Sequence, residues 1–190
     1  DLIGDGAPRP VKTLAQDAGV NEDSLYRVLR ALSMVGIFTE AAPRTFALTP
    51  AANLLRADVP GSLRNMAVFM PNPLHFRVYA EMMHSVESGQ KASEKVFGIP
   101  PFEFLARNPE ESAVFNDAMT SFSAGIIPAV LDAYDFSGIG VLADIAGGHG
   151  IVLGSILQRY PDMRGILFDQ DHVVAGAAPL DRKSTRLNSS

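Results

Sequence analysis

The 190-residue sequence contains no cysteine, few basic residues, and no run of apolar residues approaching the roughly 18 to 20 that span a bilayer. The absence of cysteine excludes disulfides and thiolate metal sites. The first ten residues, DLIGDGAPRP, have neither the basic start nor the apolar core of a signal peptide. We therefore expect a cytoplasmic protein with no membrane partner, whose 47% hydrophobic residues can bury a sizeable core.

Basic residues are outnumbered, since 16 Lys and Arg face 21 Asp and Glu. The last ten residues, DRKSTRLNSS, change composition abruptly, and we expect residues 181–190 to be a non-native tail. Without that tail, 13 Lys and Arg face 20 Asp and Glu, a formal charge of −7. Nucleic-acid binding needs clustered basic groups that neutralise phosphates, so this balance predicts no nucleic-acid partner.

Two helices are predicted near the N-terminus. Thr13 can cap the first helix, and Gly19 can end it in a left-handed turn. Asn21 is a good cap for the second helix, which Gly36 should stop. The second helix is predicted to pack through an apolar stripe at helical spacing, formed by Leu25, Val28, Leu29, Leu32 and Val35.

A hairpin and a further helix are predicted next. IFTE and TFALT flank the turn-forming AAPR, and Thr49 with Pro50 supplies a cap followed by a first-turn proline. Helix, turn, helix and hairpin in this order are typical of a winged helix, which we assign to residues 1–62. Many such folds bind DNA, but the second helix has only two arginines beside two acids. A winged-helix regulator with a ligand-sensing domain is nevertheless the alternative function, which a salt-dependent gel shift would favour.

Residues 63–136 are predicted to be helical and rich in large apolar side chains, interrupted by PNP and GIPP. Asn108 and Pro109 should open a longer helix. Pro128 should kink that helix or end it one turn early, because its ring displaces the carbonyl four residues back. We assign this stretch as a helical connector that also contributes to a substrate pocket.

From Gly140 the apolar period changes. VLADIA is a short apolar run, GGHG is a glycine-rich turn, IVLGSILQRYP follows a helical pattern, and GILFD is a second apolar run. This order predicts a βαβ unit of a parallel, doubly wound sheet. We assign residues 137–180 to an incomplete Rossmann-like domain, which makes the chain a mixed α/β protein.

The spacing of the glycines bears on the ligand. A dinucleotide fingerprint begun at Gly148 would need a third glycine where Leu153 stands, which disfavours a nicotinamide-dependent oxidoreductase. A donor without pyrophosphate still needs bare backbone beside it, and Gly147, Gly148 and Gly150 provide it. Asp144 could hold an ammonium group or merely cap the loop. Asp169 ends the second strand and is placed to accept hydrogen bonds from both hydroxyls of a ribose.

The passage VLADIAGGHGIVLGSILQRYPDMRGILFDQDHVVAGA resembles the donor-binding segment of S-adenosylmethionine-dependent O-methyltransferases of the plant caffeate and hydroxyindole type, a family with bacterial members. FEFLARNPE and FNDAM, which matches the family's FN-x-x-M signature, extend the resemblance over almost all of residues 1–180. It implies methyl transfer to a hydroxyl of a small aromatic or polyketide-like acceptor. It also implies a homodimer joined through the winged helix.

The resemblance implies a role for ten residues. The residues implied to contact S-adenosylmethionine are Ser123, Asp144, Ala146, Gly147, Gly148, Gly150 and Asp169. Those implied to line the acceptor pocket are Phe115, Met119 and Phe122. Core packing is the alternative for these three apolar side chains, because a helical apolar stripe usually faces a core. Ser123 could also bond back to its own helix.

Two positions depart from the family. Ala146 replaces the first of three glycines, and Asp171 stands where proline is common, so each puts the fit to the donor in question. The four histidines lack metal-ligand spacing, which predicts no metal site. We expect His149 to be a variable loop position, and His172 to be a packing or hydrogen-bonding residue behind the second strand rather than a base. The family's base is a histidine later in the chain, so we predict a truncated fragment without a catalytic residue and without activity.

Overall fold

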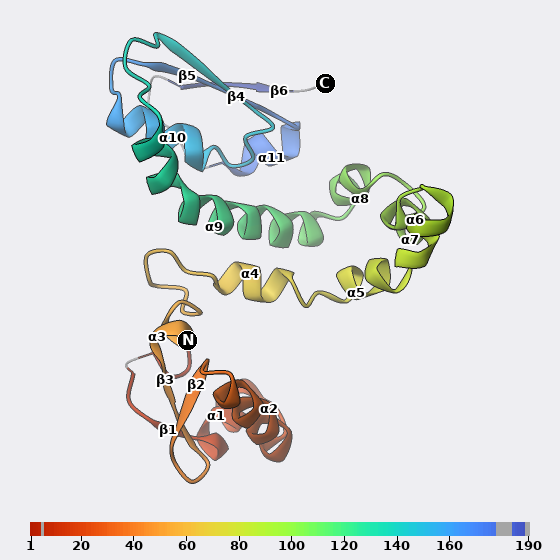
Figure 1. Ribbon diagram of the computed structural model, residues 1–190, viewed down its shortest axis with the longest axis vertical. Helices are drawn as coiled ribbons and strands as arrows, with labels where there is room; N and C mark the ends of the chain where they lie inside the picture. Colours follow the sequence, from red (N-terminus) through yellow and green to blue (C-terminus); the bar gives the residue numbers. More distant parts are fainter. Residues whose placement is uncertain (5, 178–183, 189–190) are drawn as a thin grey trace. The chain divides into compact units, whose positions relative to one another are not determined.

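The computed structural model describes residues 1–4, 6–177 and 184–188. The chain divides into two compact units, Asp1–Arg64 and Asn65–Ser190, whose elements are labelled in Figure 1. The first unit contains β1 (Arg9–Pro10), α1 (Val11–Ala18), α2 (Glu22–Met34), β2 (Phe38–Ala42), β3 (Thr45–Leu48) and α3 (Pro50–Asn53). Its strands form an antiparallel sheet in the order β1-β3-β2, and its core is formed by Ile3, Val11, Leu14, Leu29 and Phe46.

Local sequence signals set most element ends in this unit. The Asn21 side chain accepts a hydrogen bond from the backbone N–H of Ser24, which caps α2 as predicted. Gly19 ends α1 with a φ of 66°, again as predicted. The prediction that Thr13 caps α1 is wrong, because α1 begins two residues earlier, directly after a proline.

The capping of α3 and the packing of α2 complete this unit. Thr49 caps α3 by accepting from the N–H of Ala52, as predicted. The apolar stripe of α2 packs only in part, since Leu29 is buried whereas Val28 and Val35 are exposed. The helix therefore presents apolar side chains on two sides, one towards the core and one away from it.

The hairpin turn is fixed by Arg44, which has a φ of 55°. Its guanidinium forms ion pairs with Glu22 at 2.8 Å and with Asp23 at 2.9 Å, both at the start of α2. The same group lies 4.5 Å from the centre of the Tyr26 ring. The hydrogen bonds that this guanidinium donates to Glu22 and Asp23 raise the pKa of Arg44 above its ordinary value. One side chain thus ties the hairpin turn to the first turn of α2.

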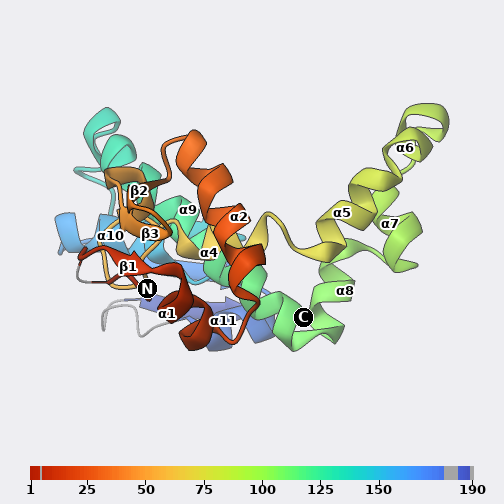
Figure 2. The same cartoon turned by 90° about the horizontal axis from the view of Figure 1, so that it is seen from below.

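The second unit begins with short helices. They are α4 (Arg64–Phe69), α5 (Pro73–Ala80), α6 (Met82–Ser88), α7 (Ala92–Phe97) and α8 (Pro101–Arg107), of which α5, α6 and α7 group together in Figure 2. Prolines stand at the first position of α5 and of α8, which places the PNP and GIPP interruptions at helix starts.

The long helix α9 (Pro109–Ala133) begins where Asn108 and Pro109 predict it. It continues through Pro128 to Ala133 rather than ending early, and its ribbon changes direction in its last part in Figure 1. By length and composition α9 would also suffice to cross a membrane, although its apolar residues are interrupted by polar ones. One such helix is weak evidence for a span, and α9 contacts both α8 and α10.

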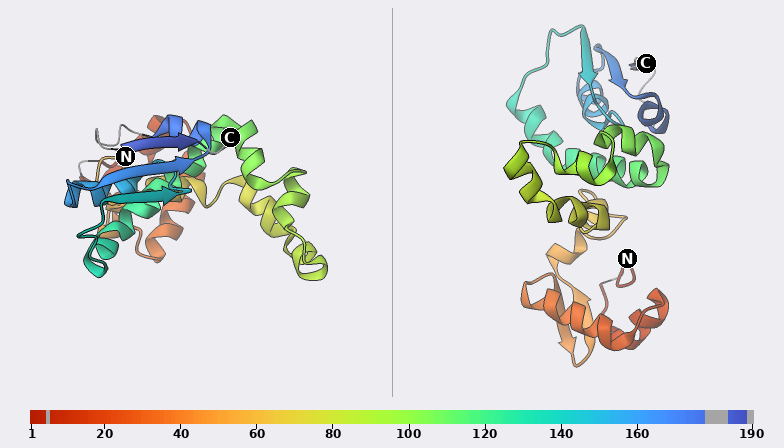
Figure 3. Two further views of the ribbon diagram at one scale, coloured as in Figure 1. Left: turned by 90° about the horizontal axis from the view of Figure 1, so that it is seen from above. Right: turned by 90° about the vertical axis from the view of Figure 1, so that its right-hand side faces the viewer.

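A parallel sheet completes the second unit. It contains β4 (Val141–Ile145), α10 (Ile151–Arg159), β5 (Arg164–Asp169), α11 (Asp171–Gly176) and β6 (Ser184–Asn188), with the strand order β4-β5-β6. Asp144 pairs with Leu167 in register, and Figure 3 shows the three strands side by side. The predicted βαβ unit is confirmed. Of the expected tail, residues 181–183 and 189–190 lie outside the described residues, and 184–188 form β6.

The core of this unit lies where α10 and α11 cover β5. Its buried residues include Leu153, Leu157 and Leu167. A Cβ on Gly165 would lie 2.7 Å from a methyl carbon of Leu157, so α10 can approach β5 only because that position is bare. In contrast, β4 leaves Val141 and Ile145 exposed. Apolar surface on parallel strands is therefore covered on one side of the sheet and open along β4.

Candidate functional site

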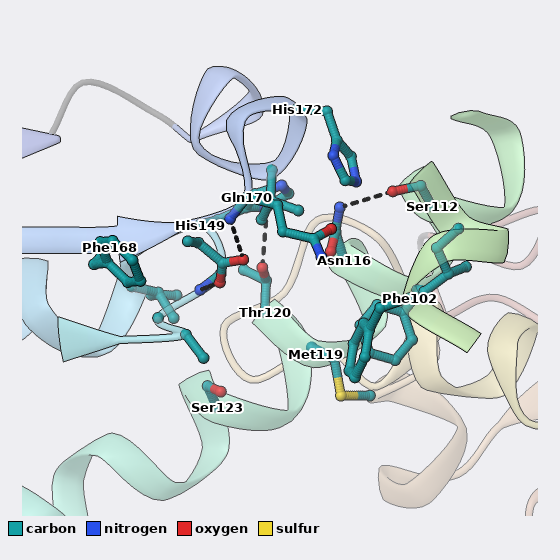
Figure 4. A pocket seen from close by; sticks show the side chains of 18 of the residues that line it. Phe102, Ser112, Asn116, Met119, Thr120, Ser123, His149, Phe168, Gln170 and His172 are labelled. Carbon is teal, nitrogen blue, oxygen red and sulfur yellow. Dashed lines mark hydrogen bonds between the residues drawn. The ribbon is translucent and has the colours of Figure 1, made fainter. Parts of the chain in front are cut away.

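A cavity of about 520 Å³ lies in the second unit. Its walls come from α8, α9, the glycine-rich loop that follows β4 (residues 146–150), the end of β5 and the start of α11. Figure 4 shows polar side chains from these elements converging with the aromatic ring of Phe102 and the thioether of Met119. The site thus combines a polar loop at a strand end with an apolar helical wall.

The cavity collects seven of the ten residues predicted from the sequence. Those lining it are Phe115, Met119, Ser123, Ala146, Gly147, Gly148 and Asp169. The three that do not line it are Asp144, Gly150 and Phe122. Asp144 and Gly150 support the glycine-rich loop from behind, as described below. Phe122 lies elsewhere on α9.

Phe122 is 53% exposed. It lies seven residues beyond Phe115, which is the same side of the helix but roughly 10 Å further along its axis. Phe115 is covered by α8, whose Phe102 ring lies 6.1 Å away. Phe122 does not line this cavity, so its predicted place in the acceptor pocket stays a prediction.

The glycine-rich loop adopts left-handed backbone conformations at alternate positions. The φ angles are 59° at Ala146, 59° at Gly148 and 74° at Gly150. Glycine adopts such angles freely, whereas an alanine pays roughly 1–2 kcal/mol for them. Alanine in place of the family's glycine at position 146 therefore costs free energy, because its backbone is held at a left-handed φ.

Gly147 and Gly148 are bare for different reasons. A Cβ on Gly147 would lie 2.5 Å from Cγ of Asp144 and 2.6 Å from a methyl carbon of Leu167. A Cβ on Gly148 would meet nothing within 4 Å. Gly147 therefore lets the loop pack onto the strands, while Gly148 leaves open space beside its backbone. Both residues line the cavity, and at Gly148 the space beside the Cα is open to a ligand.

Asp144 faces the back of this loop. Burial raises the pKa of its carboxyl, a hydrogen bond from the backbone of Leu153 lowers it, and the negative charge of Asp169 raises it further. Leu153 lies in the first turn of α10, where backbone N–H groups lack helical partners. The carboxyl of Asp144 therefore lies between the loop and the first turn of α10, and both its predicted contact with the donor and its alternative role as a cap of the loop stay predictions.

Asp169 links the end of β5 to the loop. One carboxylate oxygen accepts a hydrogen bond of 2.8 Å from the N–H of Gly148, and the other accepts one of 2.7 Å from the N–H of Gln170. A carboxylate oxygen can accept two hydrogen bonds, so both oxygens keep capacity for a ligand's hydroxyls. The carboxylate therefore shapes the loop and can also bind at the cavity.

His149 and His172 lie in places that the sequence did not indicate. His149 lines the cavity, and its Nδ1 lies 3.2 Å from Oγ1 of Thr120 on α9. His172 is exposed and also lines the cavity, so the predicted position behind the second strand is wrong. It lies on α11, which begins directly after the strand and turns this side chain towards the cavity.

A polar row on α9 was also missed. Ser112, Asn116 and Thr120 line the cavity at spacings of four residues, and the Asn116 amide donates to the buried hydroxyl of Ser112 at 3.3 Å. This periodic polar row within an apolar helix was a readable signal of a cavity wall. Among the described residues, no group of three or more His, Asp or Glu side chains could hold a metal ion.

Comparison with known proteins gives a consistent result. The family model of the O-methyltransferase domain matches residues 79–187. The phenazine O-methyltransferase PhzM of Lysobacter antibioticus is 43% identical over 177 residues, which cover 93% of this chain and 51% of that protein. The chain therefore spans about half the length of the curated relatives it matches.

Solved structures agree with this result. The crystal structure of LaPhzM matches with a TM-score of 0.91 and 37% identity, covering 99% of this chain and 60% of that one. The O-methyltransferase NcsB1 of neocarzinostatin biosynthesis, solved with S-adenosylmethionine and 2-hydroxy-5-methyl naphthoic acid, matches with a TM-score of 0.75 and 27% identity. That match covers 96% of this chain and 58% of the other. The mixed helix and sheet fold is therefore that of methyltransferase structures.

Proposed function

Since the chain belongs to the O-methyltransferase domain family, we propose that its protein transfers a methyl group from S-adenosylmethionine to a hydroxyl of a small aromatic or polyketide-like acceptor. One observation carries the proposal. A single cavity is lined on one side by the glycine-rich loop and Asp169, and on the other by the apolar side chains of α8 and α9. A nucleoside donor and an aromatic acceptor need these two surfaces side by side.

The donor side of the cavity fits S-adenosylmethionine. Gly148 leaves open space beside its backbone, and Asp169 keeps hydrogen-bonding capacity for ribose hydroxyls. The residues proposed to hold the donor directly are Ser123, Ala146, Gly147, Gly148 and Asp169, which line the cavity. Asp144 and Gly150 would act indirectly, the first by capping α10 and the second by bending the loop into that helix.

The acceptor side is proposed to be the wall formed by Phe102, Phe115 and Met119. The two phenylalanine rings meet edge to face at 82°, which leaves ring faces to pack against a planar acceptor. This agrees with the aromatic acceptor named for NcsB1. Phe122 does not line this cavity, and a role for it at the acceptor stays a prediction from the sequence.

Bound S-adenosylmethionine would supply an electrophilic methyl group. The residues of this chain would hold donor and acceptor in line and keep water away from the methyl group. Among the described residues that line the cavity, we propose no catalytic base.

The first unit is proposed to be a winged-helix dimerisation domain (residues 1–62), joined through the connector 63–136 to the donor domain 137–180. Its helix, helix and hairpin order supports this proposal, as do Val28, Met34 and Val35, which are exposed on and beside α2. We also propose a cytoplasmic homodimer without nucleic-acid or membrane partners. Nothing supports the regulator alternative, because the hairpin arginine is already paired with two acids.

Calorimetry on the full-length protein tests the proposal. We expect S-adenosylmethionine to bind and NAD not to bind. Asp169→Ala should weaken donor binding at least about tenfold, because two charge-assisted hydrogen bonds are lost. Asp162→Ala, in the exposed turn after α10, is the matched control and should leave binding unchanged. Unchanged donor affinity in Asp169→Ala would contradict the proposal.

A further inference from the structure

We propose that His149 is a positioning residue that fastens the glycine-rich loop to α9 and thereby sets the affinity for the donor. This inference rests on the proposed function, because the loop is the proposed donor surface. His149 is expected to touch neither the transferred methyl group nor a metal ion. It acts by holding the backbone around it.

The loop offers one side chain with which to make such a contact. Residues 147, 148 and 150 are glycines, so the imidazole of His149 is the only group in this stretch that extends beyond the backbone. Its Nδ1 and Oγ1 of Thr120 share a hydrogen bond of 3.2 Å, drawn as a dashed line in Figure 4. Both side chains are half-buried, so water competes little for the bond.

The other edge of the imidazole meets the end of α11. A Cβ built on Gly176 would lie 3.3 Å from Nε2 of His149, closer than an ordinary contact. The ring is therefore placed between Thr120 on α9 and the bare backbone of Gly176. A larger residue at Gly176 would push the imidazole away from its present position.

Two other hydrogen bonds of the loop are made to β5 rather than to α9. The N–H of Ala146 donates to the carbonyl of Phe168, and the N–H of Gly148 donates to Asp169. These bonds fix the loop to β5. The His149 bond reaches α9, the helix that carries Phe115 and Met119. It therefore sets the spacing between the proposed donor surface and the proposed acceptor wall.

Fixing this spacing before the donor arrives should raise affinity. Three residues of the loop have left-handed backbone angles, a conformation that a loosely held chain leaves easily. A loop already held in its binding conformation loses less entropy when the ligand binds. Loss of the His149 bond should therefore appear in the dissociation constant of the donor rather than in a proton-transfer step.

The test measures binding of S-adenosylhomocysteine to the full-length protein by calorimetry. We expect about 3- to 10-fold weaker binding for His149→Ala and for Thr120→Val, the range of one lost hydrogen bond. The double variant should bind no more weakly than the weaker single variant, because both changes remove the same bond. His84→Ala, on α6 outside the cavity, is the matched control and should bind normally.

Two further variants separate positioning from simple stability. His149→Asn places an amide where Nδ1 stands and should recover most of the lost affinity, whereas His149→Gln, with its amide one bond further out, should not. Gly176→Ala should weaken binding in the presence of His149 and have no effect in His149→Ala. Melting temperatures measured in parallel should stay close to that of the unchanged protein for all of these variants.

Several outcomes would overturn the inference. Unchanged affinity in His149→Ala would do so, as would additive losses in the double variant. A loss of turnover with normal S-adenosylhomocysteine binding would place His149 in the chemistry instead. A lowered melting temperature without rescue by Asn would indicate a merely structural role. If the unchanged protein fails to bind S-adenosylhomocysteine at all, the proposed function falls first, and this inference falls with it.

Discussion

Two turns, one in each unit, hold a residue other than glycine in the left-handed region. In the first unit Arg44 has a φ of 55°, and in the second Ala146 has a φ of 59°. Arg44 offsets its strain with two ion pairs and a ring contact. Ala146 carries only a methyl group, which offers no such compensation. The strain at Arg44 is offset by contacts that stabilise the fold. The strain at Ala146 is not offset by its side chain and lies in a cavity wall, which points to a binding loop.

The largest expected effect concerns the residue beside Ala146. Gly147→Ala should lower the free energy of unfolding by about 2 kcal/mol, because a Cβ would stand 2.5 Å from Cγ of Asp144 in a packed loop. Chemical denaturation of the full-length protein measures this change. Gly148→Ala is the informative control, since its Cβ meets open space and only the φ penalty remains. Equal losses in both variants would refute the distinction between packing and openness.

The second expected effect concerns the hairpin turn at Arg44, where contacts of the side chain offset the backbone strain. Arg44→Ala should lower the melting temperature, because the left-handed angle stays while both ion pairs are lost. Arg44→Gly should lower it less, since glycine relieves the backbone. High salt screens the ion pairs, so it should lower the melting temperature of the unchanged protein towards that of the variants. Identical melting temperatures for Ala and Gly at this position would show that the angle carries no cost there.

The third expected effect is a stabilisation rather than a loss of stability. Ala146→Gly should raise the free energy of unfolding by about 0.5 to 1 kcal/mol, because relief of the left-handed strain exceeds the entropy that glycine adds to the unfolded chain. Thermal denaturation checks this expectation, and donor calorimetry shows whether the methyl group also hinders binding. Destabilisation by Ala146→Gly would mean that the alanine methyl makes a useful contact.

The smallest effect is a dependence on pH. Burial raises the pKa of Asp144, so its contribution to stability is present at low pH and is lost as pH rises through the folded-state pKa. Asp144→Asn should remove this component while keeping an oxygen for the N–H of Leu153. Unfolding free energies of both proteins between about pH 3 and pH 7, which bracket the ordinary pKa of aspartate, test it. Parallel pH curves would contradict the assignment.

The sequence predicted the features that local chemistry decides. The caps at Asn21 and Thr49 and the turn at Gly19 depend on residues within one turn of each other, and the βαβ unit follows from the order of three consecutive elements. The glycine-rich loop and Asp169 were found for the same reason, since a loop and the strand that follows it have fixed geometry in a parallel sheet. Their roles as ligands stay proposals.

The features that the sequence did not predict depend on contacts between distant segments. His149 meets Thr120, 29 residues away, and no local signal links the two. His172 faces the cavity because α11 starts immediately after β5. Phe122 shares a helix side with Phe115 but is exposed and does not line the cavity. Periodicity gives the side of a helix, whereas the neighbour that covers it comes from the tertiary fold.

The open side of β4 has a practical consequence for anyone who prepares this segment by itself. Val141 and Ile145 are exposed, and β4 ends the sheet among the described residues, so its backbone is free to pair with another strand. Exposed edge strands can pair with the edge strands of other copies of the same polypeptide. We expect light scattering by the purified segment to grow with concentration, and a lysine at position 145 to suppress it.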